Sequence, residues 1–181
     1  MMQSVELTLI KIIGDHFYEN TGKLRKVEFN GRNFFDRYER IDSQLTMSIQ
    51  KEHFEGKRVI AHDLINDKEK IVENIVFDYN GYDPDRFWHR AQLMLREMGF
   101  VNFTAYRTKT NGHLHLYVHK GHTILSEAYQ LANKLSMTLS QKLPCSWRMF
   151  PNIDMPREFQ ILNLPYDLFQ KERGASWSKF M

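Results

Sequence analysis

Apart from a hydrophobic core, the sequence offers few means of stabilising a fold, such as disulfides or cysteine-bound metal ions. It contains one cysteine, Cys145, so it can form neither an internal disulfide nor a cysteine-based zinc site, and we expect a reducing, cytoplasmic setting. No apolar run is long enough to cross a bilayer. The apolar patch at residues 7–13 is interrupted by Lys11, and no small-residue cleavage site follows it, so we expect neither a signal peptide nor a membrane partner.

Internal repeats, low-complexity tracts and blocks of like charge are also missing, which argues against solenoid and disordered architectures. What is present is ordinary for a globular domain: 42% hydrophobic and 26% charged residues in a chain of 181. We therefore expect one structural domain. The net charge of +3 and the sequence pI near 8.9 are compatible with an anionic ligand.

Residues 1–70 contain short apolar groups broken by glycines, and we interpret them as an N-terminal helical extension packed on the core. Residues 5–17 and 43–54 have a helical spacing of apolar side chains, and residues 58–65 are typical of a short strand. The main core is expected over residues 71–181, including a C-terminal tail.

The pattern is clearer from residue 72 onward. Strands are predicted over residues 72–79, 100–107, 113–119 and 159–164. One helix is expected to begin after Asp83 and Pro84 and to end at Gly99, and a second to run from Gly121 to before Pro144. The order β, α, β, β, α, β predicts an α/β (α+β) fold with a split βαβ sheet, ferredoxin-like or RNA-recognition-motif-like, with both helices on one face.

Strand alternation predicts which side chains occupy the other, open face of this sheet. If Phe77 and Leu116 face the helices, then Asp78 and Asn80 on the first strand and His115 on the third face away from them. An acid and an imidazole would then lie on adjacent central strands. The alternative is that this face is simply solvated, as one face of an antiparallel sheet often is.

Three segments in order resemble a known family. They are IVFDYN with Asp78, RTKTNGHLHLY with a basic hairpin and His115, and MFPNID with Asp154. Together they resemble the motifs of the archaeo-eukaryotic primase, or primase-polymerase, superfamily. The resemblance implies catalytic residues and a site for a nucleoside triphosphate. Its implied catalytic set is Asp78, Asp154 and His115, its phosphate-binding set is Arg107, Thr108, Lys109, Thr110 and His115, and its metal ligands are Asp78, Asn80 and Asp154.

The resemblance also implies Mg²⁺ or Mn²⁺ as cofactor, because nucleotidyl transfer needs carboxylate-held metal to activate the attacking hydroxyl and neutralise the phosphates. One position departs from the family pattern. The second acid of the catalytic pair is Asn80, an amide that adds no negative charge. We therefore expect nucleotide binding in a degenerate site and leave the enzymatic activity open.

Two other functions are kept beside this hypothesis. The first is a non-catalytic adaptor for nucleic acid or protein, which would have inherited the fold without the chemistry. The second is a metal-binding histidine face formed by His113, His115, His119 and His122. The chain is also similar to a small uncharacterised bacterial family known only as a domain of unknown function, and that similarity implies no activity.

Overall fold

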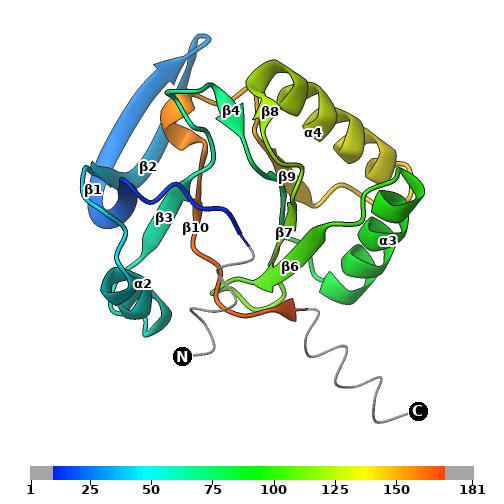
Figure 1. Cartoon of the computed structure of the whole chain (residues 1–181), viewed down its shortest axis with the longest axis horizontal. Helices are drawn as coiled ribbons and strands as arrows, with labels where there is room; N and C mark the ends of the chain where they lie inside the picture. The colour runs from blue at the N-terminus through cyan, green and yellow to red at the C-terminus, as the bar shows by residue number, and fades with distance from the viewer. Residues whose placement is uncertain (1–9, 170–181) are drawn as a thin grey trace.

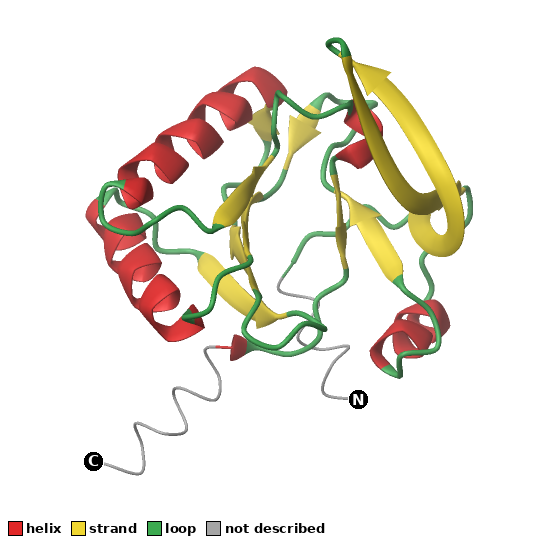
Figure 2. Cartoon of the chain, turned by 180° about the vertical axis from the view of Figure 1, so that it is seen from behind, coloured by secondary structure: helices red, strands yellow, loops and turns green. Residues whose placement is uncertain are grey.

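The computed structural model describes residues 10–169, which form three layers. Two helices, α3 and α4, cover one face of a central sheet, and a second sheet covers its other face (Figure 1). The same arrangement is seen from behind in Figure 2, where the helices and the second sheet lie at opposite sides of the central strands. The mixed α+β class expected from the sequence is confirmed.

The central sheet has four antiparallel strands in the order β6-β7-β5-β9. Their bounds are β5 Ile75–Tyr79, β6 Phe103–Arg107, β7 Leu114–Val118 and β9 Trp147–Phe150. This is the strand order of a split βαβ fold, with the first and third strands of the unit as central neighbours. The predicted topology is therefore present, but its fourth strand is β9 and not the segment at residues 159–164.

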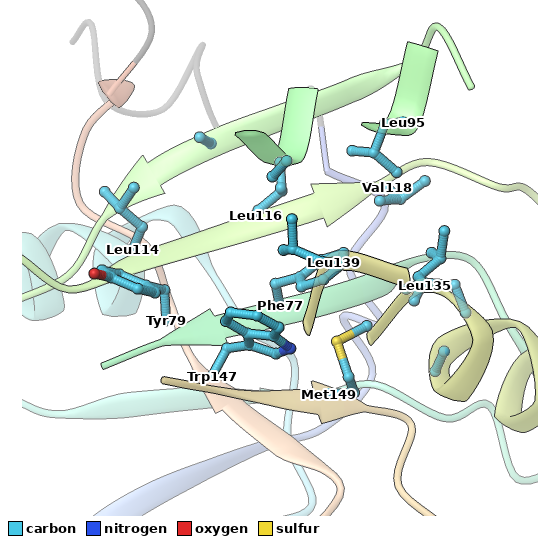
Figure 3. Packing of buried hydrophobic residues seen from close by; sticks show 14 of the residues in the cluster. Phe77, Tyr79, Leu95, Leu114, Leu116, Val118, Leu135, Leu139, Trp147 and Met149 are labelled. Atoms are coloured by element: carbon cyan, nitrogen blue, oxygen red, sulfur yellow. The ribbon is translucent and has the colours of Figure 1, made fainter. Parts of the chain in front are cut away.

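Helices α3 (Pro84–Glu97) and α4 (Leu125–Ser140) form where the sequence predicts them. Asp83 caps α3 by accepting a hydrogen bond from the backbone N–H of Arg86 at 3.0 Å, which satisfies a donor that the helix start leaves free. Buried residues of both helices pack on Phe77, Leu116 and their neighbours in the sheet (Figure 3). This cluster is the larger of the molecule's apolar cores and fixes the sheet on the helix side.

The second sheet has the strand order β10-β3-β1-β2. Its bounds are β1 Phe17–Phe29, β2 Arg32–Ile41, β3 Ile60–Asp63 and β10 Ile161–Asn163, and helix α2 at Met47–Phe54 connects β2 to β3. Asn30 and Gly31, with φ of 50° and 73°, form a two-residue turn that joins β1 to β2. Positive φ at both positions is typical of the hairpin turn that an Asn-Gly pair favours.

Several expectations for the extension and the last strand are wrong. Residues 10–16 are not helical and residue 17 begins β1, while residues 5–9 of that predicted helix lie outside the described residues. The extension is thus mainly a β-hairpin, although the helix predicted over residues 43–54 is present as α2. The strand predicted at residues 159–164 exists as β10, but it pairs with β3 in the second sheet. The boundary at residue 70 stays a prediction.

The face of the central sheet expected to be open is covered. Val76, Tyr117 and Phe150 on that face pack against Leu64 and Leu162 from the second sheet and its flank. The prediction of an open face is wrong because the N-terminal region, expected to be a helical extension on the core, forms with β10 a sheet that packs on this face. Large apolar side chains on both faces of β5 and β7 are what a sheet buried on two sides requires.

Two short strands complete the described fold. β4 (Ile71–Val72) pairs with β8 (Thr123–Ile124) as a separate ribbon at the start of α4. None of the helices within residues 10–169 combines the length and the apolar character needed to span a membrane.

A tight contact follows β5 and generates a stability prediction. A Cβ added at Gly81 would lie 2.3 Å from the hydroxyl oxygen of Tyr79. The Tyr79 side chain cannot move aside freely, since it is buried, its ring stacks on Phe87 at 4.3 Å and its hydroxyl oxygen accepts a hydrogen bond from the Asp83 N–H. We expect Gly81→Ala to lower the free energy of unfolding by about 1–3 kcal/mol in urea denaturation.

The matched control is Gly14→Ala. An added Cβ at Gly14 has no atom within 4 Å, so this change should alter stability by no more than about 0.5 kcal/mol. Equal effects of the two substitutions would show that the Tyr79 contact is not what requires glycine at residue 81.

Candidate functional site

A cleft of about 330 Å³ lies between the two sheets. Its walls come from β2, β5, β9, the loop between β6 and β7, and the segment that leads into and past β10. The polar side chains that line it include Asp36, Asp78, Asn80, Thr108, Lys109, Thr110, His113, His115, Arg148 and Asn163. Most of the phosphate- and metal-binding set predicted from the sequence thus lines one cavity.

Asp78 is the buried acid of this cleft, with 4% of its surface exposed. Strand register explains its surroundings, because His115 on β7 and Arg148 on β9 are its directly paired neighbours on either side. Arg148 Nη2 donates to Asp78 Oδ2 at 2.7 Å, and His115 Nε2 lies 3.3 Å from Asp78 Oδ1. The three side chains therefore form one row across three adjacent strands.

Burial by itself would raise the pKa of Asp78, because it disfavours the charged carboxylate. The hydrogen bond and charge of His115, together with the charge and hydrogen bond of Arg148, outweigh that effect and lower the pKa of Asp78 to about 2. Asp78 is consequently ionised at neutral pH. Its negative charge is compensated within the row and is not presented unshielded to a ligand.

His115 has one ring nitrogen engaged and one without a partner. With Nε2 directed at Asp78, its Nδ1 is buried and makes no hydrogen bond to any described residue. An unsatisfied nitrogen in the interior costs free energy, so a partner from outside the described protein atoms, such as water or ligand, would stabilise it. The buried Nδ1 of His115 therefore marks a place for a polar group beside this ring.

The loop between β6 and β7 forms the basic lip of the cleft. Thr108 and Thr110 shape it, since the Thr108 hydroxyl donates to the Thr110 carbonyl at 3.1 Å and accepts from the Thr110 N–H at 3.2 Å. Lys109 between them is exposed, and no carboxylate of the described residues lies within ion-pair distance of its ammonium group. Lys109 is thus an available cation at the entrance.

Other predicted residues are placed less centrally. Arg107 lies at the end of β6 with its guanidinium over the Phe169 ring at 5.7 Å, and it lines a neighbouring hollow on the other side of the lip. Asn80 is exposed at the rim and donates from Nδ2 to the Asp78 carbonyl at 3.2 Å. Asp154 lies in an exposed turn, where its N–H bonds Asn152 Oδ1, and it does not line the cleft.

The residues of the cleft do not fit a two-metal site as arranged. A hard divalent cation needs several oxygen ligands, usually with more than one carboxylate. Asp78 has both oxygens directed at nitrogen donors, and Asp154 lies elsewhere. Within residues 10–169, no group of three or more His, Cys, Asp or Glu side chains is positioned to hold a metal ion. The predicted Mg²⁺ or Mn²⁺ site gains no support from this geometry.

The histidines that suggested a metal-binding face have separate partners. His119 bridges Thr104 and Asn74 at 2.9 and 2.8 Å, and burial lowers its pKa. His122 pairs with Glu73 at 2.6 Å outside the sheet. His113 alone joins His115 in lining the cleft. Neighbouring side chains thus engage the imidazoles of His115, His119 and His122 separately, so the four histidines do not form one metal-binding face.

Sequence reasoning missed Arg148 and His62. The alternation in WRMF, with Trp147 and Met149 in the core and Arg148 opposite, could have predicted a strand with an outward cation. His62 on β3 stacks on Tyr117 at 5.9 Å, and its Nε2 lies 2.8 Å from the Tyr117 hydroxyl. That contact joins the two sheets, and nothing local in the sequence signals it.

Burial, aided by the charge of nearby His115, lowers the pKa of His62 to about 4. A histidine with a depressed folded pKa contributes stability above its unfolded pKa of about 6.5, and this is lost as pH falls toward 4. We expect the free energy of unfolding to fall by about 2–3 kcal/mol between pH 7 and pH 4.5 through this residue. Urea unfolding of wild type and His62→Gln at both pH values would measure it.

The buried His53 and His119, whose pKa values burial also lowers, remain in the variant, so the difference between the two proteins isolates His62. An unchanged pH dependence in His62→Gln would contradict the assignment.

Comparison with known proteins adds a family match for part of the chain. Residues 2–74 match a domain of unknown function (DUF1882). That segment includes the hairpin, α2 and β3, and it ends one residue before β5, so Asp78, His115 and Arg148 lie outside it. No curated protein matches the chain. The primase-polymerase resemblance therefore stays a prediction.

Proposed function

We propose that the cleft between the two sheets binds the phosphate groups of a nucleotide, with a nucleoside triphosphate as the first candidate, and that it does so without nucleotidyl transfer. The proposal rests on one observation: the buried acid of the cleft is neutralised by its neighbours, while a cation at the entrance is available to a ligand. Asp78 is compensated by Arg148 and His115, and Lys109 has no carboxylate partner among the described residues.

Arg148 supports phosphate recognition through its remaining donors. One terminal nitrogen is held by Asp78, and the guanidinium side chain is 59% exposed. A guanidinium has five N–H donors in a planar fork, so the others remain able to bind phosphate oxygens. Asp78 would then act as a positioning residue that holds this fork toward the cleft.

The cleft also has groups that suit the rest of a nucleotide. Aromatic side chains from both sheets and their connections line it: Phe35, Tyr38, Phe150, Phe159 and Tyr166. Aromatic faces are good partners for bases because every base has a π-face. The volume of about 330 Å³ is at the lower end of typical small-molecule sites. A cavity lined by both charged and aromatic side chains matches an amphipathic ligand of this class.

Binding without catalysis is proposed because the two acids that line the described cleft, Asp78 and Asp36, are both already paired: Asp78 with Arg148 and His115, and Asp36 with Arg25. The affinity should therefore persist in the presence of a metal chelator.

Isothermal titration with nucleoside triphosphates in EDTA tests the proposal. Lys109→Ala should weaken binding by about tenfold or more, because a hydrogen bond to a charged group is worth roughly 1.5–3 kcal/mol. Arg148→Lys should also weaken it, since a lysine keeps the charge beside Asp78 but loses the planar fork. Lys134→Ala, on the exposed side of α4, is the matched control and should bind as wild type.

A nucleotide affinity that neither Lys109→Ala nor Arg148→Lys changes would overturn the proposed site. Failure of every nucleotide to bind would overturn the function itself, and the adaptor hypothesis would then take its place.

A further inference from the structure

Strand β2 is an open edge of the second sheet. It has ten residues, and its one partner strand among residues 10–169 is β1. The β1–β2 ribbon extends well past β3, which pairs with β1 only at Tyr18 and Glu19 (Figure 2). An edge strand of this length presents a row of backbone donors and acceptors to any strand that can approach it.

Of the usual protections of an edge strand, β2 has charged side chains but neither a proline nor a bulge of its own. The strand contains neither proline nor glycine, and the irregularity in the β1–β2 register falls in β1, between Asn20 and Arg25. Bulges and prolines are common means of preventing edge-to-edge pairing. β2 is thus regular along its whole length. β2 also exposes the large apolar side chain of Phe35, which is 55% accessible.

The ribbon is also held in place. Arg25 pairs with Asp36 across its two strands at 2.5 Å, Phe34 contacts the Phe159 ring at 6.0 Å, and the Tyr38 hydroxyl bonds Asn163 Oδ1. An edge that is already ordered loses little conformational entropy when a partner pairs with it.

The charges on β2 complement those of a second β2 strand. Two copies related by a two-fold axis pair antiparallel, and if the axis passes at Tyr38, Arg37 lies opposite Glu39 of the second copy. In the same register Asp36 lies opposite Arg40, and Phe35 opposite Ile41. Every such pair occurs twice, and none joins like charges.

Neighbouring registers are less favourable. An axis at Asp36, Arg37 or Glu39 would place that residue opposite its own copy, and like charges directly opposite each other destabilise a strand pair. The two side chains of the Arg37–Glu39 pair are accessible. Arg37 donates to the Gly22 carbonyl, and Glu39 is 43% exposed with Lys23 at 3.8 Å.

We propose that two copies of this chain associate through β2, in the antiparallel register centred on Tyr38, so that their second sheets become one continuous sheet. The occupant of the edge is therefore a second copy and not an unrelated peptide. Because the contact is confined to one strand on each side, it belongs to the small interfaces, and the dimer should be concentration-dependent.

Sedimentation velocity over a concentration series of the full chain tests this. Wild type should shift from monomer to dimer as concentration rises. Arg37→Glu should shift the transition to higher concentration by about tenfold or more, since it places two glutamates opposite each other twice. The double variant Arg37→Glu with Glu39→Arg restores opposite charges in the same register and should recover the dimer.

Arg90→Glu, with the same charge change on the exposed side of α3, should sediment as wild type. Circular dichroism spectra establish that each variant is folded. A wild type that stays monomeric at all concentrations, or a charge swap that fails to restore association lost in the single variant, would overturn the proposal.

Discussion

The ion-paired carboxylate of Asp78 is the constraint on which the rest of the structure depends. A charged group in the interior is costly unless it is paired and hydrogen-bonded, and Asp78 obtains its partners from the strands on both sides of it. A slip of either neighbour by one residue would turn His115 or Arg148 to the opposite face of the sheet. The row of three side chains thus fixes the register of β7, β5 and β9. The same row forms the polar part of the cleft that the central sheet contributes.

The parts of the fold that could be predicted are those with local signals. Asp83, Pro84 and the apolar spacing of Phe87, Ala91 and Met94 determine α3 within a short stretch of chain. The hairpin β1–β2 has one clear signal, Asn30-Gly31, but both strands are rich in polar residues and β1 is irregular, and the glycines divide the apolar residues into short groups. Nothing local indicates that β10 leaves the central unit to pair with β3, since that pairing joins distant segments.

The candidate site was partly predictable for the same reason. Alternation on β5 and β7 places Asp78 and His115 on one face, and the loop between β6 and β7 follows from its turn residues. Asp154 was expected nearby because of its order in the sequence, but the turn that follows β9 carries it away from the cleft. His62, Phe35 and Tyr38 come from the second sheet, and no sequence pattern predicts its position over the central sheet.

The pairing of β10 with β3 has a consequence for how the protein is made. β3 ends at Asp63 and β10 begins at Ile161, so the second sheet cannot be completed until almost the whole described chain has left the ribosome. The central unit with its helices ends earlier, at Phe150, and consists largely of contacts within itself. The N-terminal hairpin is therefore synthesised first but finds its last strand only at the end, and nascent chains expose β3 to chaperones or to wrong partners in the interval.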